Sequence, residues 1–386
     1  MKLVTLINGY YPKIGGAERV MTALNPVLQS KGVDVHVLTR RFPGMSAYEE
    51  VTGIPVHRLP LPSPKALASF SYTYESLKRI SRLKPDIIHV HDLFSTATTG
   101  ALAKQLKHIP IAATIHRSGP LGDIYRLHKK PLGKQRWRFF ARTFDTFVAI
   151  SSEIKNELAS LGIPQHRRVA IPNGVDTQRF HPVSIERKAA LRAELGLSRD
   201  PIVIFVGRLA SEKRVSHLLT IWEDVRRIIS GATLLILGEG PEEDILKDKT
   251  PAGVRFEGGV DDVSPYLQVA DVFVLPSIAE GFSIAALEAQ AAGAAVLMTD
   301  VGGARDMVTH NQNGWLLPPD DIDELKSGLI ALLTDHALRK RLSVAGRARV
   351  EQQFSLDAMA DRLVSVYLRA VERTSMKGSG VVINEE

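Results

Sequence analysis

The chain has 386 residues, of which 44% are hydrophobic and 24% charged; this composition is typical of globular proteins, and the length favours two domains. No stretch approaches the ~20 apolar residues of a membrane-spanning helix, and we expect the short apolar N-terminus, Met1 to Asn8, to form a strand and not a signal peptide. Because the chain has no cysteine, disulfides, thiolate metal sites and a cysteine nucleophile are excluded, and we expect a cytoplasmic protein.

The net charge of +7 is divided unevenly. Residues 1–180 contain 26 Lys and Arg against 12 Asp and Glu, a balance of +14, which leaves 23 against 30, a balance of −7, for residues 181–386. A basic first half attracts anionic partners, such as lipid head groups, nucleic acids or acidic glycans.

Short apolar or alternating runs rich in Val, Ile, Leu and Thr recur along the first half, and we predict that they are β-strands. They lie at residues 2–8, 34–40, 54–59, 86–91, 110–116 and 145–151. Helical patterns separate most of them; the pattern at 17–30 predicts a helix that ends at Gly32. Such alternation favours a parallel sheet covered by helices on both faces.

The same alternation begins again near Pro201. Strands are predicted at residues 202–206, 233–237, 254–257, 271–275 and 294–299. The predicted fold class is therefore α/β, with two Rossmann-like, doubly wound parallel-sheet domains in series. Prolines and a charged, weakly periodic segment place the boundary between Asn173 and Arg199.

These boundaries predict the domain organisation of the whole chain. It consists of an N-terminal domain at 1–180, a linker at 181–199, a C-terminal domain at 200–355, an amphipathic helix at 356–373 and a disordered tail at 374–386. Ligands of open parallel sheets bind beyond the carboxyl ends of the strands, so we expect the site in a cleft between the domains.

The segment from Glu280 to Glu288 is the most informative motif. It follows an apolar strand and leads into an Ala-rich helix expected to start near Ser283, whose unpaired amides can hold a phosphate. Gly281 lets a ligand approach, and the two carboxylates are placed to accept hydrogen bonds from hydroxyls on either side. This pattern suits a sugar nucleotide; the alternative, two unrelated surface carboxylates, is weakened by the order of strand, glycine and helix.

A second motif follows the first strand of the C-terminal domain. Gly207, Arg208 and Lys213 lie on a strand-to-helix loop, where a guanidinium and an ammonium can reach a diphosphate. Charge builds on the phosphate oxygens when a nucleoside diphosphate leaves, so fixed cations there are catalytic as well as ligating. The alternative is an ordinary basic loop.

The N-terminal domain offers a glycine turn and three histidines. Gly15 and Gly16 open a helix whose amides can face the ligand, and His116 ends a strand and is expected to point into the cleft. His89 is expected to be a packed core histidine, with His91 at the end of the same strand. Since no His and Glu show zinc-site spacing, we predict no required metal.

The run Leu237 to Pro241 invites comparison with a dinucleotide-binding turn. Glu243 stands at the third glycine position and Pro241 interrupts the approach to the helix, so a nicotinamide or flavin enzyme is disfavoured.

The stretch from Arg126 to Arg142 contains seven basic residues and no acidic one. On a helix, one face carries the apolar residues Trp137, Phe140, Ala141 and Phe144. Such a helix can rest on an anionic membrane surface, or its apolar stripe can pack on the sheet with the charges in solvent; both alternatives stay open. Nucleic-acid binding is disfavoured because no reader motif accompanies the charge.

Taken together, the motifs resemble the retaining glycosyltransferases of family 4, which have two Rossmann-like domains facing a cleft, the glycosyltransferase B type. The resemblance covers nearly the whole chain. It rests on Gly15 to Glu18, Ile171 to Asp176, Gly207-Arg208 with Glu212-Lys213, Glu280 to Glu288, Gly302-Gly303 and Asn313-Gly314.

The resemblance implies roles for these residues. Arg208 and Lys213 bind the donor diphosphate, Glu280 and the backbone after it bind the sugar, Glu288 binds the ribose, and His116 contacts the donor sugar. The candidate residues are Arg208, Lys213, Glu280 and His116 for catalysis and, for donor binding, Gly15, Gly16, Gly207, Gly238, Gly259, Val260, Gly281, Phe282, Ser283, Ile284 and Glu288. The C-terminal helix is expected to cross back onto the first domain.

The implied reaction is metal-independent hexosyl transfer from a nucleoside-diphosphate sugar with retention at the anomeric carbon, by front-face attack. With the basic first half, we expect a lipid-linked or glycan acceptor and peripheral association with the inner face of a membrane, in glycan or glycolipid biosynthesis. Two alternatives stay open: a nucleotide-sugar epimerase or phosphorylase on the same fold, and a non-catalytic protein that binds polyanions or membranes.

Overall fold

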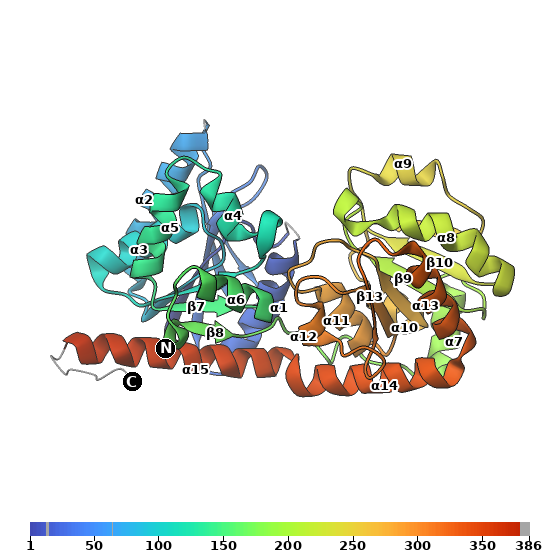
Figure 1. Ribbon diagram of the computed structural model, residues 1–386. Coiled ribbons are helices and arrows are strands. Elements are labelled where there is room, and N and C mark those ends of the chain that lie inside the picture. The colour runs from blue at the N-terminus through green and yellow to red at the C-terminus, as the bar shows by residue number, and fades with distance from the viewer. Residues whose placement is uncertain (13–14, 64, 379–386) are drawn as a thin grey trace. The chain divides into compact units, whose positions relative to one another are not determined.

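The computed structural model describes residues 1–12, 15–63 and 65–378 (Figure 1). The chain forms two compact units. Residues Met1–Asn173 and Leu356–Glu386 make up the first, and Gly174–Ser355 make up the second. The boundary therefore lies at Asn173, within the predicted interval and seven residues before the predicted end of the first domain at 180.

An eight-stranded sheet forms the centre of the first unit, in the order β3-β4-β2-β1-β5-β6-β7-β8. Its strands are β1 (Lys2–Leu6), β2 (Asp34–Arg40), β3 (Tyr48–Val51), β4 (Ile54–Leu59), β5 (Ile87–Val90), β6 (Ile111–Ile115), β7 (Thr146–Ala149) and β8 (Arg168–Ala170). Every pairing is parallel except that of β3 with β4. The strands β5, β6 and β7 are buried along their whole length, which explains their continuous apolar runs.

Seven helices surround this sheet in the described part of the first unit. They are α1 (Gly16–Ser30), α2 (Lys65–Leu83), α3 (Ser95–Lys107), α4 (Asp123–His128), α5 (Gly133–Thr143), α6 (Ser152–Ser160) and α15 (Leu356–Gly378). The predicted helix at 17–30 is α1, which buries Val20, Met21, Leu24 and Leu28. Gly32, with φ +80°, follows its end, because glycine adopts this left-handed conformation without steric cost.

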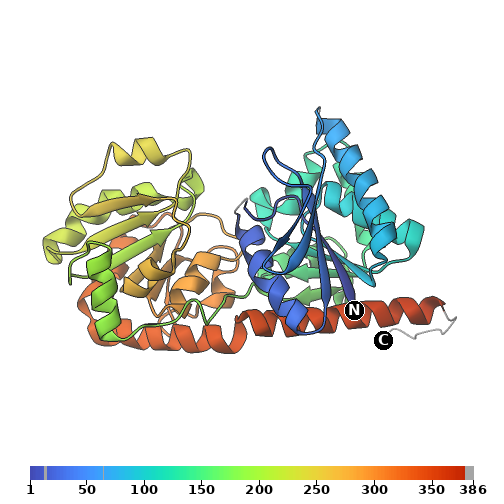
Figure 2. The ribbon, with the colours of Figure 1, turned by 180° about the vertical axis from the view of Figure 1, so that it is seen from behind.

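The C-terminal helix α15 belongs to the first unit, where it packs against α1, β5 and β6. Figure 2 shows α1, in dark blue, beside α15, in red. The predicted apolar face is confirmed: Met359, Leu363, Val366, Tyr367 and Ala370 are all buried. The predicted start of the tail at 374 is wrong, because the helix continues to 378; residues 379–386 of that tail lie outside the described residues.

A six-stranded parallel sheet, in the order β11-β10-β9-β12-β13-β14, forms the centre of the second unit. Its strands are β9 (Ile202–Val206), β10 (Thr233–Leu237), β11 (Val254–Gly258), β12 (Val272–Leu275), β13 (Ala295–Thr299) and β14 (Trp315–Leu317). Its helices are α7 (Ile185–Glu194), α8 (Val215–Ile228), α9 (Glu243–Lys247), α10 (Ser264–Val269), α11 (Ile284–Ala291), α12 (Ala304–Met307), α13 (Ile322–Thr334) and α14 (His336–Gln353). The predicted fold class, two Rossmann-like α/β units, is confirmed.

The predicted linker at 181–199 is wrong as a linker, because it contains α7 and this helix is anchored to the second sheet. Lys188 Nζ and Arg192 Nη2 lie 3.0 and 2.8 Å from the carboxylate oxygens of Asp271, beside the start of β12. The same carboxylate accepts a hydrogen bond from Ile202 N at 2.9 Å. The charged character of the segment thus reflects ion pairs with the sheet.

Each predicted strand is present, shortened by a residue or two at some ends, but β3, β8 and β14 were not predicted. Each has only three or four residues and lies at a sheet edge. Such strands need little apolar sequence, so periodicity does not reveal them.

Candidate functional site

The two strongest motifs of the second unit follow neighbouring strands, β9 and β12, whose carboxyl ends lie at one edge of the parallel sheet. The structure brings Lys213 and Glu280 together: Nζ lies 2.5 Å from Oε1, and the two side chains are only 14% and 8% exposed. Ile278 N also donates to Glu212 O at 2.8 Å, which ties the two loops to each other. This edge therefore holds a cation and a carboxylate in a rigid, partly desolvated pair.

Arg208 lies on the loop directly after β9. Its backbone is held because Ala210 N donates to Arg208 O at 3.0 Å and Leu209 N donates to Glu239 O at 2.9 Å. Its side chain is exposed and makes no hydrogen bond or ion pair with any residue that the structure describes. The guanidinium is thus available to an anion that binds at this edge.

Glycines let the loops at this edge approach one another closely. Gly207 N donates to Leu237 O at 2.9 Å, and Gly238 N donates to Gly258 O at 2.7 Å. Gly238 has φ +130°, and a Cβ there would lie 2.0 Å from Gly207 O. Gly259 is exposed and Val260 half-buried at the end of β11.

The segment after β12 forms the N-terminus of α11. Ser283 caps the helix, its Oγ accepting a hydrogen bond from Ala286 N at 3.3 Å. Gly281, Phe282 and Ser283 are buried and Ile284 is half-buried, so the sequence prediction of a helix start at this point is confirmed. Glu288, in the second turn, is only 3% exposed.

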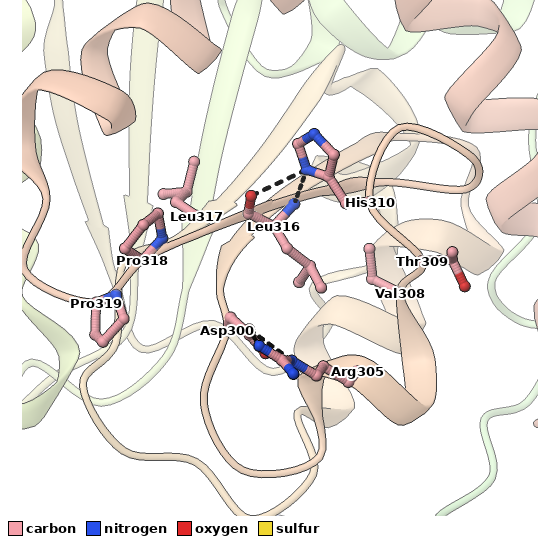
Figure 3. A pocket seen from close by; sticks show the side chains of 9 residues that line it. All are labelled: Asp300, Arg305, Val308, Thr309, His310, Leu316, Leu317, Pro318 and Pro319. Carbon is pink, nitrogen blue, oxygen red and sulfur yellow. Dashed lines mark hydrogen bonds and ion pairs between the residues drawn. The ribbon is translucent and has the colours of Figure 1, made fainter.

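A hollow of about 740 Å³ lies near the same edge, after β13 and β14 (Figure 3). It is lined by Asp300, Arg305, Val308, Thr309, His310, Leu316, Leu317, Pro318 and Pro319. Arg305 Nε donates to Asp300 Oδ1 at 2.8 Å, and Leu316 N donates to His310 Nδ1 at 3.2 Å. None of the predicted site residues lines this hollow: those of the second unit follow β9, β10, β11 and β12, and Gly15, Gly16 and His116 belong to the first unit.

In the first unit, three histidines gather at the ends of β5 and β6. The ring centroids of His89 and His91 lie 4.1 Å apart, and those of His91 and His116 lie 5.6 Å apart. The prediction that His89 is a core histidine is confirmed, since it has no exposed surface. His116 N donates to Asp123 Oδ2 at 2.7 Å, which holds the start of the loop after β6.

Burial keeps these imidazoles neutral. It lowers the pKa of His89 to about 3 and the pKa of His91 well below its ordinary value, with neighbouring histidines adding to both shifts. Burial also lowers the pKa of His116, although Asp123 acts to raise it. At neutral pH the rings therefore act as neutral hydrogen-bonding groups and not as cations.

The glycine turn of the first unit is open. Gly15 caps α1 in an extended conformation, and a Cβ on Gly16 would have no atom of the described residues within 4 Å. Packing against the described residues therefore does not require glycine at position 16. The two residues before this turn, 13 and 14, lie outside the described part of the chain.

Sequence reasoning missed a polar cluster at the same edge of the first sheet. Arg40 Nε donates to Asn8 Oδ1 at 2.7 Å, and Asn8 Nδ2 donates to Asp92 Oδ2 at 2.6 Å. Burial raises the pKa of Asp92 to about 6, despite its hydrogen bonds with Thr96 and the backbone of Phe94. The sequence contained a signal for this cluster, because Arg40 ends a parallel strand and Asn8 and Asp92 each lie two residues beyond the end of one.

The basic stretch at 126–142 is not one helix. Leu132, with φ +56°, separates α4 from α5. Trp137, Phe140 and Phe144 are buried, so the packing alternative is right, and the hypothesis that this apolar face lies on a membrane is wrong. The charged face stays in solvent: Lys134, Arg138 and Arg142 are exposed. Beside them lies a hollow of about 570 Å³, lined by Trp137, Arg138, Ala141, Arg142, Leu161, Gly162, Ile163, Pro164 and Arg167.

No helix in the described part of the chain is both long and apolar enough to cross a lipid bilayer. The His, Asp and Glu side chains of the described residues form no group of three or more that could hold a metal ion.

Family models match both halves of the chain. Residues 14–179 match the model described as Glycosyltransferase Family 4, and residues 187–349 match the model described as Glycosyl transferases group 1. The two matches correspond to the first and second units, with α15 beyond both.

Known proteins resemble the chain over nearly its whole length. An uncharacterized glycosyltransferase of Methanocaldococcus jannaschii is 30% identical over 96% of this chain and 99% of its own length. The glycogen synthase of Mycobacterium tuberculosis is 29% identical over 95% of this chain and 94% of its own. The crystal structure of Anabaena HepE in complex with UDP-glucose shares the fold, with a TM-score of 0.78 at 18% identity over 95% of this chain and 99% of that chain. The chain therefore belongs to the group 1 glycosyl transferases of family 4, with the glycosyltransferase B type fold, and is a glycosyltransferase that uses a nucleotide-sugar donor.

Proposed function

We propose that the edge at β9 and β12 binds a nucleoside-diphosphate hexose and that the enzyme transfers the hexose, with retention and without a metal, to a hydroxyl of a lipid-linked or glycan acceptor. The observation that carries this proposal is the Lys213–Glu280 pair beside the exposed Arg208. A cation for the diphosphate and a carboxylate for the sugar hydroxyls are held in contact at one point. In a sugar nucleotide, the diphosphate and the sugar hydroxyls are adjacent in the same way.

In the proposed reaction, the bond from the anomeric carbon to the phosphate oxygen breaks as the acceptor oxygen bonds to that carbon on the same face. The acceptor proton passes to a leaving phosphate oxygen. Lys213 has three N–H donors, of which Glu280 accepts one, so two stay available to the diphosphate. Arg208 and Lys213 stabilise the charge that builds on the phosphate, and Lys213 needs little rearrangement to do so because Glu280 holds it.

The remaining candidate residues are proposed to hold the rest of the donor. The N-terminus of α11, from Gly281 to Ile284, places backbone amides and the positive end of the helix dipole toward the donor. Glu288 accepts from the ribose hydroxyls, and Gly207, Gly238, Gly259 and Val260 let the nucleotide lie close to the backbone. Gly15, Gly16 and His116 of the first unit are proposed as further donor contacts. HepE, solved with UDP-glucose, and glycogen synthase support a hexose donor.

The proposal is tested by measuring nucleoside diphosphate release from a panel of sugar nucleotides, with and without glycan and lipid-linked acceptors. We expect Lys213→Ala to lower kcat/KM by about 10²- to 10³-fold, because a fixed cation at the leaving group is lost. Glu288→Ala is expected mainly to raise the donor KM. Lys247→Ala is the matched control, since this lysine on α9 is half exposed and pairs only with Glu243 among the described residues.

Undiminished turnover in both Lys213→Ala and Glu288→Ala would contradict the site. Conversion of a sugar nucleotide to its epimer without any acceptor would contradict transferase chemistry and favour an epimerase. Addition of EDTA is expected to leave the rate unchanged, and a loss of activity that Mg²⁺ or Mn²⁺ restores would contradict metal independence.

We also propose that the enzyme acts in the cytoplasm at the inner face of a membrane. The balance of +14 over residues 1–180 supports this, as do the exposed Lys134, Arg138 and Arg142 on α5. Electrostatic attraction to anionic lipids would bring the enzyme to a lipid-linked acceptor.

A further inference from the structure

The strands β5 and β6 direct alternate side chains to the face of the sheet that α15 covers. Successive side chains of a strand point to opposite faces, so His89 shares a face with His91, and Thr114 shares one with His116. The register pairs His89 with Ala112, which makes Thr114 its diagonal neighbour on the adjacent strand. The imidazoles of His89, His91 and His116, here called the histidine row, therefore follow one another toward the carboxyl edge of the sheet, with the hydroxyl of Thr114 beside the first.

His89, the ring farthest from the carboxyl edge, is held at both nitrogens. His89 Nδ1 lies 2.6 Å from the hydroxyl of Tyr367 on α15, and His89 Nε2 lies 2.7 Å from Thr114 Oγ1. All three side chains are buried. A neutral imidazole has one donor and one acceptor nitrogen, and each hydroxyl can play the complementary part, so the two bonds define the plane of the His89 ring.

The middle ring has no such support. Both ring nitrogens of His91 are buried and have no hydrogen-bond partner among the residues that the structure describes, and the same is true of His116 Nε2. The orientation of His91 thus depends on its ring contacts, with His89 at 4.1 Å on one side and His116 at 5.6 Å on the other. Any tilt of His89 is transmitted to His91, because a close-packed core leaves little free space.

We infer that Tyr367 and Thr114 are positioning residues: they orient His89, and the His89–His91 ring contact passes this orientation to His116. The inference rests on the proposed function in one respect, that His116 contacts the donor sugar. It gives α15 a role beyond covering the sheet, since Tyr367 of this helix holds His89, which lies 278 positions away in sequence.

The charge states of the groups are consistent with this arrangement. Burial lowers the pKa of all three histidines, so the tilted rings lie next to one another without the mutual repulsion of imidazolium ions. Burial also raises the pKa of Tyr367 far above its ordinary value, so its hydroxyl stays protonated beside His89. The row is neutral throughout, and its order depends on hydrogen bonds and ring contacts alone.

The test uses the full chain with three substitutions. Tyr367→Phe and Thr114→Val each remove one hydroxyl and keep the shape of the side chain, whereas Thr114→Ser restores the hydroxyl. We expect kcat to fall about three- to tenfold in the first two with the donor KM unchanged, since a displacement of ~1 Å at a reacting group costs about 10²-fold and a ring tilt displaces it by less. Thr114→Ser is expected to retain most of the wild-type kcat.

A second readout needs no substrate. Side-chain ¹⁵N and ¹³C NMR signals of His91 and His116, assigned with His91→Gln and His116→Gln proteins, report the tautomer and ring environment. We expect them to shift in Tyr367→Phe and Thr114→Val and to return in Thr114→Ser. Val366→Ala, which removes buried volume from the same helix, is the control: it should lower Tm but leave kcat and these signals unchanged.

The outcomes separate this inference from the proposed function. Wild-type kcat and unshifted His116 signals in both hydroxyl-deleted variants would overturn the positioning role while leaving the transferase proposal intact. Equal losses of kcat in Val366→Ala would also overturn it, because general loosening of α15 would then suffice. If the wild-type protein turns over no sugar nucleotide, the proposed function fails, and the NMR shifts alone decide whether the row is coupled.

Discussion

At position 238 the backbone itself requires a glycine. Its φ of +130° lies in a region that side chains with a Cβ rarely adopt, and a Cβ there would lie 2.0 Å from Gly207 O. Position 16 is different, because a Cβ would meet no atom of the described residues and the residue begins α1. Glycine at 238 therefore serves the close approach of two loops, whereas packing against the described residues gives no reason for the glycine at 16, which we propose as a donor contact.

We predict that Gly238→Ala lowers the free energy of unfolding of the second unit by at least about 1–3 kcal/mol, because of backbone strain and the clash with Gly207 O. Gly16→Ala should change stability by less than about 1 kcal/mol, and in the stabilising direction, yet lower the donor kcat/KM. Urea denaturation and donor kinetics measure the two effects. A fully active Gly16→Ala enzyme would remove position 16 from the site.

At the scale of elements, ion pairs attach α7, the helix between the two sheets in sequence, to the second unit. Burial acts to raise the pKa of Asp271, but Lys188 and Arg192 outweigh it and hold that pKa below its ordinary value. The two cations come from α7, and the carboxylate also binds the amide that begins β9. Helix α7 is thereby joined to both central strands of the second sheet.

Asp271→Ala should therefore destabilise the second unit by about 3 kcal/mol, because it leaves two partly buried cations without their partner. Glu194→Ala is the matched control on the same helix: its pair with Arg187 has both side chains more than half exposed, so the loss should be under about 1 kcal/mol. Chemical denaturation followed by tryptophan fluorescence in a Trp137→Phe background reports on this unit, because Trp222 on α8 and Trp315 on β14 both belong to it. Equal effects of the two substitutions would refute the anchoring role of Asp271.

For the whole molecule, the distribution of charge matters more than its net value. The positive balance lies in residues 1–180 and the negative balance in the remainder, so an anionic surface attracts the first half and repels the second. Since the aromatic face of α5 is buried in the core, any such attraction is carried by exposed cations without insertion of that face.

We predict that the protein binds vesicles containing phosphatidylserine and that binding falls steeply as salt is raised. Reversing two charges with Arg138→Glu and Arg142→Glu should weaken binding by at least about 2 kcal/mol, at about 1 kcal/mol per basic residue lost near the surface. The control reverses Arg227 and Lys340, two exposed residues of the second unit, which changes the net charge equally. Co-sedimentation measures binding, and equal losses in both double variants would show that only net charge matters.

The sequence alone determined the central strands, the buried face of α15, the core position of His89 and the helix start after Ser283. These depend on local properties: apolar runs that must be buried, helical spacing, and an N-cap side chain that bonds to the amide three residues on. The family also followed from the sequence, because its motifs are short, contiguous and correctly ordered along the chain.

Only the tertiary structure decided which of these residues meet. Lys213 contacts Glu280, 67 residues away in sequence, because β9 and β12 are neighbours in the sheet. Tyr367 reaches His89 because α15 belongs to the first unit. The same holds for α7: its charged sequence predicts a linker, and only the structure shows that Lys188 and Arg192 pair with Asp271. It holds also for α5, whose aromatic stripe is compatible with a membrane surface as well as with a protein core. Periodicity shows that a face is apolar or charged; strand order and packing determine what covers it.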